Sequence, residues 1–209
     1  MKGERDMGIL DIIMLTKKYY RKLTDNRFTL FLGVIFVGIT DVFIPYLLDN
    51  LKVLFIDKTQ AIVYQNLLTT VVLIFLLGTV DVFFFAIPLF DLFKVFKKEN
   101  EGGPNSIIRL MKVYISAHFL IVPVNLLLYF FTPAADSAAS SGTLGYLTAL
   151  LALVVIIWFS AIITRGINSI YSFEPIYRKL IFIIVFIWNF LLGIGLEYIL
   201  NNWLWKLFR

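Results

Sequence analysis

The chain has 209 residues, of which 60% are apolar, 17% aromatic and 16% charged, with a formal net charge of +5. So few polar residues cannot cover the surface of a water-soluble globule, and the composition predicts an integral membrane protein. The absence of cysteine excludes disulfides and thiolate metal sites, and the single histidine, His118, excludes a site built from several histidines. We therefore expect neither a metal centre nor a cofactor.

Residues 1–27 precede the first long apolar stretch. From Ile9 to Leu23, a helical projection places apolar side chains on one side and basic side chains on the other. This pattern predicts a cytosolic amphipathic helix that lies in the membrane interface, and the alternative is a short solvated helix packed on the bundle. The residues expected to contact anionic headgroups are Lys17, Lys18, Arg21 and Lys22.

Residues 28–209 contain five stretches close to the roughly 20 residues that a helix needs to cross a bilayer. The sequence therefore predicts an all-α, polytopic bundle of five transmembrane helices. The predicted spans are residues 28–48, 67–90, 113–131, 144–164 and 180–200.

The distribution of basic residues predicts the orientation. The segments before, between and after the spans contain seven, two, five, none, three and two Lys and Arg residues in chain order. A cytosolic N-terminus and an outer C-terminus place 15 of them inside and 4 outside, as the positive-inside rule requires. The basic excess is thus explained by topology, and no nucleic-acid partner is expected.

Two of the apolar stretches share the pattern G-x-x-D-V-F, which places Asp41 and Asp81 near the middle of the first and second spans. On neighbouring antiparallel helices the two carboxyl groups would lie at similar depth. An ionised carboxylate there is costly, and no Lys or Arg lies within the five spans to neutralise it. The pair therefore either joins helices as neutral groups or binds a proton or another cation.

Three prolines inside spans are predicted to kink their helices, because each removes the amide that would bind the carbonyl four residues earlier. They are Pro45, Pro88 and Pro123, which free the carbonyls of Asp41, Phe84 and Phe119.

Further polar residues complete the predicted intramembrane set. His118 lies inside the third span, where an interfacial hydrogen bond and a proton shuttle are the two alternatives. Asn125 and Asn189 are candidates for bonds between helices, and Gly193 and Gly195 for a point of close packing. Glu197 falls near the outer surface, where it needs no special partner.

After Pro88 the helical pattern continues toward Gly102, so the second helix is expected to extend into the cytosol. This extension combines aromatic and basic residues and is a candidate contact for a partner or for the membrane surface. Its residues are Phe93, Phe96, Lys97 and Lys98. No metalloprotease, serine hydrolase, nucleotide or dinucleotide motif is present, and we expect no enzymatic activity.

The five-span order, the Gly102-Gly103 turn before the third span and the stretch "IIWFSAIITRGINSIY" resemble the Yip family, the Ypt/Rab-interacting membrane proteins. On this resemblance Tyr114 and Pro123 match the tyrosine and proline of the family's third span, and Trp158 the tryptophan of its fourth. Trafficking members carry a long soluble N-terminal region, whereas 27 residues precede the first span here. The resemblance therefore implies a prokaryotic relative in the plasma membrane.

Two functions follow from these observations. One is a non-enzymatic, Yip-like protein that organises or associates with other membrane proteins or with a second copy of itself. The other is a small cation- or proton-coupled permease or channel subunit that uses Asp41 and Asp81. In both, the lipid bilayer is the surrounding partner.

Overall fold

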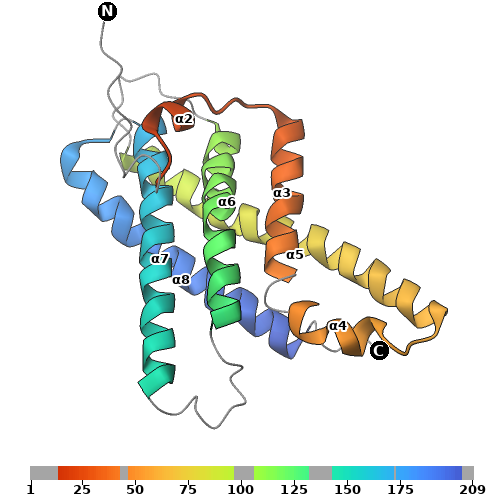
Figure 1. The fold of residues 1–209 in the computed structure, drawn as a ribbon. Helices are drawn as coiled ribbons and strands as arrows, with labels where there is room; N and C mark the ends of the chain where they lie inside the picture. The colour runs from red at the N-terminus through yellow and green to blue at the C-terminus, as the bar shows by residue number, and fades with distance from the viewer. Residues whose placement is uncertain (1–13, 43–46, 97–105, 132–142, 172, 204–209) are drawn as a thin grey trace, which may run out of the picture.

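The computed structural model describes residues 14–42, 47–96, 106–131, 143–171 and 173–203. Every element in these ranges is a helix, which confirms the all-α fold (Figure 1). The helices are α2 (Lys17–Arg21), α3 (Arg27–Val42), α4 (Leu48–Phe55), α5 (Gln60–Phe96), α6 (Ile107–Phe131), α7 (Thr143–Ile170) and α8 (Pro175–Asn202).

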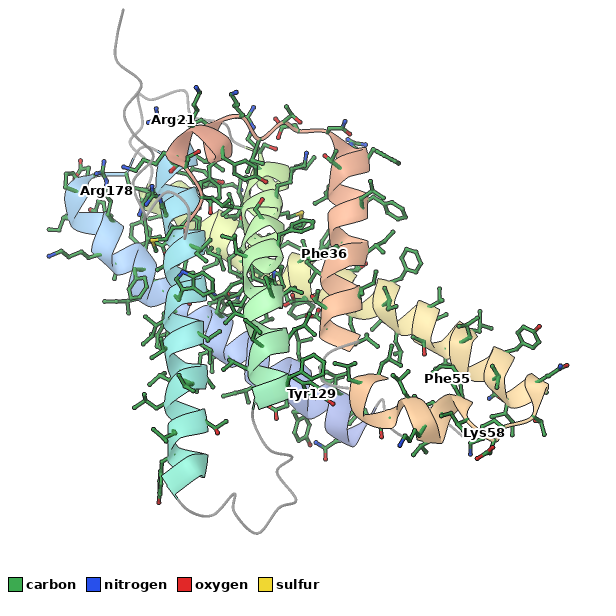
Figure 2. All side chains as sticks on the ribbon, in the orientation of Figure 1. Arg21, Phe36, Phe55, Lys58, Tyr129 and Arg178 are labelled. Carbon is green, nitrogen blue, oxygen red and sulfur yellow. The ribbon has the colours of Figure 1, made fainter. Side chains whose placement is uncertain are left out.

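Four helices, α5, α6, α7 and α8, are long and apolar enough to cross a membrane, which indicates an integral membrane protein. In Figure 1, α3, α6 and α7 stand upright and α5 and α8 cross them obliquely. We call the end of the bundle that carries α2 the α2 end, and the opposite end the α4 end. Figure 2 shows Arg21 and Arg178 at the α2 end and Lys58 at the α4 end.

Four of the five predicted spans fall on the apolar helices α5 to α8, although their bounds differ from those of the helices. The helix in the first predicted span, α3, has 16 residues and ends at Val42, a length of about 24 Å. Pro45 lies outside the described residues, and the short helix α4, which no pattern in the sequence predicted, follows. By contrast, α5 begins at Gln60 rather than Leu67 and continues past Pro88 to Phe96.

The described part of the N-terminal segment packs on the bundle. Helix α2 has five residues, and the side chain of Thr16 caps it by accepting a hydrogen bond from the amide of Tyr19. Tyr20 is fully buried and donates its hydroxyl to the carbonyl of Ile162, 3.3 Å away on α7. Lys17, Lys18, Arg21 and Lys22 are exposed. These contacts favour a short helix packed on the bundle over a helix that lies in the membrane interface. Residues 9–13 of the predicted amphipathic helix lie outside the described residues.

The aromatic extension of α5 also packs within the chain. Phe93 is fully buried, with its ring centroid 5.7 Å from that of Phe173, and the rings of Phe96 and Tyr177 are 5.2 Å apart. Phe93 is therefore unavailable to a partner, contrary to the sequence prediction. The basic residues of that predicted surface, Lys97 and Lys98, lie outside the described residues.

The backbones of α3 and α5 come into close contact at the two glycines of the repeated pattern. A Cβ atom on Gly38 would lie 1.9 Å from the carbonyl oxygen of Ile74, and one on Gly78 would lie 2.2 Å from that of Val34. Only glycine permits this approach, since real side chains do not come within 3 Å of such atoms. Gly193 and Gly195 were predicted to form a close contact, but a Cβ atom added to either would meet nothing within 4 Å, and that prediction is wrong.

Helices α5 and α6 run through Pro88 and Pro123 without interruption. The carbonyl of Phe84, which lacks its helical donor because of Pro88, accepts a hydrogen bond of 3.1 Å from the indole Nε1 of Trp188 on α8. The proline thus creates an acceptor that joins α5 to α8.

We expect Gly38→Ala and Gly78→Ala to destabilise the protein by about 1–3 kcal/mol each, the usual cost of overpacking. The obstructing atoms belong to backbone carbonyls, which cannot turn away without separating the helices. Thermal unfolding in detergent measures the loss. Gly195→Ala is the matched control and should be neutral or stabilising, because its new methyl group meets nothing. Equal melting temperatures for all three variants would contradict the close approach.

We expect Trp188→Phe to cost between about 0.6 and 1.7 kcal/mol, the range for hydrogen bonds between membrane helices, because the Phe84 carbonyl loses its donor. In a Pro88→Ala background the restored amide supplies that donor, so the same substitution should cost less. A double-mutant cycle of unfolding free energies measures the coupling. Identical costs in both backgrounds would show that the indole does not serve this carbonyl.

Candidate functional site

The crossing of α3 and α5 brings the two intramembrane acids together. Asp41 and Asp81 each lie three residues, about one helical turn, after the glycine at the contact. His118 on α6 completes the group, and one ligand atom from each of the three side chains lies within 4.8 Å of the others. We call these three residues the Asp-His cluster. It confirms that the predicted acids are neighbours and adds the imidazole to them.

Asp81 is fixed by a tyrosine. The hydroxyl of Tyr114 lies 2.9 and 3.0 Å from the two carboxylate oxygens of Asp81, and both residues are buried. The Tyr114 ring stacks on Phe85, one turn along α5 from Asp81, with centroids 3.9 Å apart and planes 12° from parallel. The stacked ring holds the hydroxyl in place, so the Asp81 carboxyl has a defined orientation.

The ring of His118 has a defined tautomer when it is neutral. Its Nδ1 lies 3.1 Å from the backbone carbonyl of Tyr114, which can only accept a hydrogen bond, so Nδ1 carries the hydrogen. The Nε2 atom then has a free lone pair, and it faces Oδ2 of Asp81 at 3.7 Å. This distance is too long for a hydrogen bond. Two electron-rich atoms therefore face each other with space between them.

Within the described residues, Asp41 lacks a partner for one of its carboxyl oxygens. Its Oδ2 atom is buried and has no hydrogen-bond partner among the described residues. An unsatisfied buried carboxyl oxygen calls for an explanation, such as a bound proton, ion or water. The Asp-His cluster thus contains an acceptor that the described part of the chain leaves unpaired.

The Asp-His cluster opens onto two adjoining cavities of about 600 and 400 Å³. The larger extends from Asp41 and His118 toward the α4 end, where Tyr129 and Leu200 line it; Figure 2 shows Tyr129 near that end of α6. On the other side of the cluster, toward the α2 end, the helices are tightly packed around fully buried residues such as Phe85, Leu110 and Ile163. The Asp-His cluster therefore borders both cavities on one side and the tightly packed helices on the other.

The remaining predicted site residues are divided between this cavity and the helix contacts. Asn125 lines the larger cavity, and Asn189 lines the smaller one while its Nδ2 donates to Ser160 Oγ on α7 at 3.1 Å. The predicted bond between helices is thus confirmed for Asn189. Pro123 lies on α6 beyond the cluster, and Trp158 packs against the core with a buried Nε1 that has no partner among the described residues.

Two residues of the site were not identified from their own chemistry. Tyr114 was singled out only by the family resemblance, although its position four residues before His118 places both on one face of α6. Glu197 was assigned to the surface, yet it lines both cavities. Its position four residues after Gly193, which also lines both cavities, is the signal that could have found it.

Comparison with protein-family models, curated proteins and solved structures found no match for this chain. The site is therefore interpreted from its geometry.

The cavity can be tested for water, because the chain contains no cysteine and single thiols can be introduced. Val155 lines the larger cavity, whereas its neighbour Val154 is 53% exposed on the outer surface of the bundle and does not line it. We expect Val155→Cys to react with a membrane-impermeant thiol reagent added from one side, and Val154→Cys to remain unreactive. The thiolate that reacts forms in water and not in lipid. Equal labelling of the two variants, measured by mass shift, would show that the cavity is filled with lipid or closed.

Proposed function

We propose that the protein is a small permease or channel subunit for a cation, with the Asp-His cluster as the cation site. The observation that carries this proposal is the meeting of Asp41, Asp81 and His118, from three different helices, beside two adjoining cavities.

The charges of the cluster support a cation. Ionised carboxylates in a low-dielectric interior require a balancing positive charge, and no described Lys or Arg side chain forms an ion pair with either acid. Lys112, the basic residue on α6 nearest in sequence to the cluster, is directed to the α2 end, where its Nζ donates to the carbonyl of Thr24 at 2.6 Å. A mobile cation can provide the missing charge.

The cavity supports access by that cation. Its wall is mostly apolar but includes the oxygen-bearing side chains of Asn125 and Glu197 between the cluster and the α4 end. A polar residue inside a membrane bundle is expensive and is retained mainly along pathways for ions or substrates. The carboxylate of Glu197 would attract cations into the cavity.

We place this protein in the membrane with five spans, the α2 end in the cytosol and the C-terminus outside. Most described basic residues support this orientation. The α2 end has α2, the beginnings of α6 and α8 and the end of α7, which carry Lys17, Arg21, Arg109, Arg178 and Arg165, whereas the α4 end has Lys52 and Lys58. Helix α3 would belong to the first of these spans. The cavity would then open to the outside, and on the Yip resemblance the membrane is a prokaryotic plasma membrane.

A Yip-like, non-enzymatic organiser of membrane proteins is the other function that the sequence suggests. The described residues give it less support, because Phe93 is buried and Phe96 packs on Tyr177.

The test is cation flux into proteoliposomes that contain the full chain, with H⁺, Na⁺, K⁺, Mg²⁺, Mn²⁺ and Zn²⁺ offered separately. We expect Asp81→Asn to reduce the flux of the transported cation at least about tenfold, which corresponds to about 1.4 kcal/mol of lost interaction, and Asp41→Asn to act similarly. Both substitutions keep the shape of the side chain and remove its charge.

The matched control is Asp91→Asn, which changes an exposed aspartate on the same helix, α5, that pairs with Lys94 at 2.7 Å. It should leave flux unchanged. Unchanged flux in Asp81→Asn and Asp41→Asn, together with a lower melting temperature, would show that the acids only hold the bundle together.

A further inference from the structure

We propose that the cation bound by the Asp-His cluster is a divalent transition-metal ion, with the Asp41 and Asp81 carboxylates and His118 Nε2 as its ligands. This inference rests on the proposed function, because it names the class of cation that the same site takes.

The combination of ligand atoms favours this class. Sodium, magnesium and calcium sites use oxygen ligands, whereas an imidazole nitrogen beside carboxylates suits Mn²⁺, Fe²⁺ or Zn²⁺. His118 is the single histidine of the chain, and it lies at the point where the two acids meet. We expected no metal centre because the chain has no cysteine and one histidine, but a site made of one histidine and two carboxylates needs neither thiolates nor several histidines.

The orientation of the His118 ring is the one that a metal ligand needs. A coordinating histidine usually donates its other ring hydrogen to a carbonyl or carboxylate, which fixes the tautomer and directs the free nitrogen at the metal. In His118, Nδ1 is held by the carbonyl of Tyr114 at 3.1 Å, and Nε2 faces Asp81. The backbone of α6 therefore prepares Nε2 to bind a metal before the ion arrives.

The spacing of the ligand atoms requires only a small closure. Oxygen and nitrogen ligands lie about 2.0–2.2 Å from such an ion, so two ligands are about 3 Å apart when adjacent and about 4.3 Å apart when opposite. The three atoms here lie within 4.8 Å of one another. Side-chain rotation of Asp41, whose Oδ2 has no partner among the described residues, can bring them to bonding distance.

Tyr114 acts as a positioning residue for the metal. Its hydroxyl donates to Asp81 from 2.9 Å and stabilises the ionised carboxylate in one orientation, while its carbonyl holds His118. One residue thus orients two of the three ligands. Its hydroxyl belongs to the outer shell of hydrogen bonds around the site, where substitutions typically cost about 10–100-fold in metal affinity.

The charge of the ion matches the site. Two ionised carboxylates and a neutral imidazole carry a charge of −2, which one divalent ion cancels and one monovalent ion does not. Three protein ligands also leave coordination positions open for water or for exchange. The adjoining cavity supplies space for that water, and an open coordination position allows an ion to leave as well as to bind.

Metal binding by the full chain in detergent tests this inference. Co²⁺ serves as the probe, because its visible absorption reports nitrogen and oxygen coordination, and Mn²⁺ and Zn²⁺ are titrated by calorimetry. We expect one ion per chain. His118→Ala, Asp81→Asn and Asp41→Asn should each weaken binding at least about 100-fold, and Tyr114→Phe about 10–100-fold with the cobalt spectrum shifted. Asp91→Asn should bind like the unsubstituted chain.

Folding is monitored in the same samples. Zn²⁺ should raise the melting temperature of the unsubstituted chain and of Asp91→Asn, and leave that of His118→Ala unchanged. This metal-dependent shift separates lost binding from lost folding, and an equal shift in His118→Ala would overturn the assignment of His118 as a ligand.

The two proposals can fail separately. Flux of H⁺ or Na⁺ that requires Asp81, with no binding of Co²⁺, Mn²⁺ or Zn²⁺, would overturn the metal inference and leave the cation permease. Metal binding that requires His118, without flux of any cation, would overturn the permease and leave a metal site in a membrane protein.

Discussion

The contact between the backbones of α3 and α5 at Gly38 and Gly78 determines the position of the other parts of the site. Because neither residue has a Cβ, carbonyl groups of one helix approach the backbone of the other. Without an aqueous phase to drive apolar faces together, membrane helices associate through such close packing. The contact also determines the positions of Asp41 and Asp81, which follow the two glycines by one turn.

Burying two carboxyl groups side by side costs free energy, and the surrounding residues reduce this cost more for Asp81 than for Asp41. Asp81 receives the Tyr114 hydroxyl, whose ring is held by Phe85, and has His118 beside it. Asp41 has a buried oxygen without a partner among the described residues and borders the cavity. An acid that only joined helices would be expected to find its partners within the protein. The difference between the two carboxyls therefore supports a binding site more than a purely structural pair.

The sequence predicted the parts of this arrangement that depend on local pattern. Long apolar stretches predicted the positions of α5 to α8, the repeated G-x-x-D-V-F pattern indicated two related acids, and Pro88 predicted a free carbonyl at Phe84. Contacts that depend on how helices rotate and cross could not be predicted. Phe93 was assigned to an exposed surface because its pattern matched an amphipathic stripe, but the rings of Tyr171 and Phe173 cover it. Gly193 was predicted to pack closely against another helix, which Gly38 does in the structure. Instead, Gly193 lines the cavity.

The distribution of packing around the Asp-His cluster limits how an ion can move. The larger cavity extends from the cluster toward the α4 end, whereas the fully buried side chains of Phe85, Leu110 and Ile163 pack toward the α2 end. A path through that half would have to expose several large apolar side chains, each worth roughly 1.5–3 kcal/mol when buried. For the cation permease that we propose, this arrangement predicts that an ion enters and leaves from the same end. That proposed function would also require a second conformation in which the packed half opens.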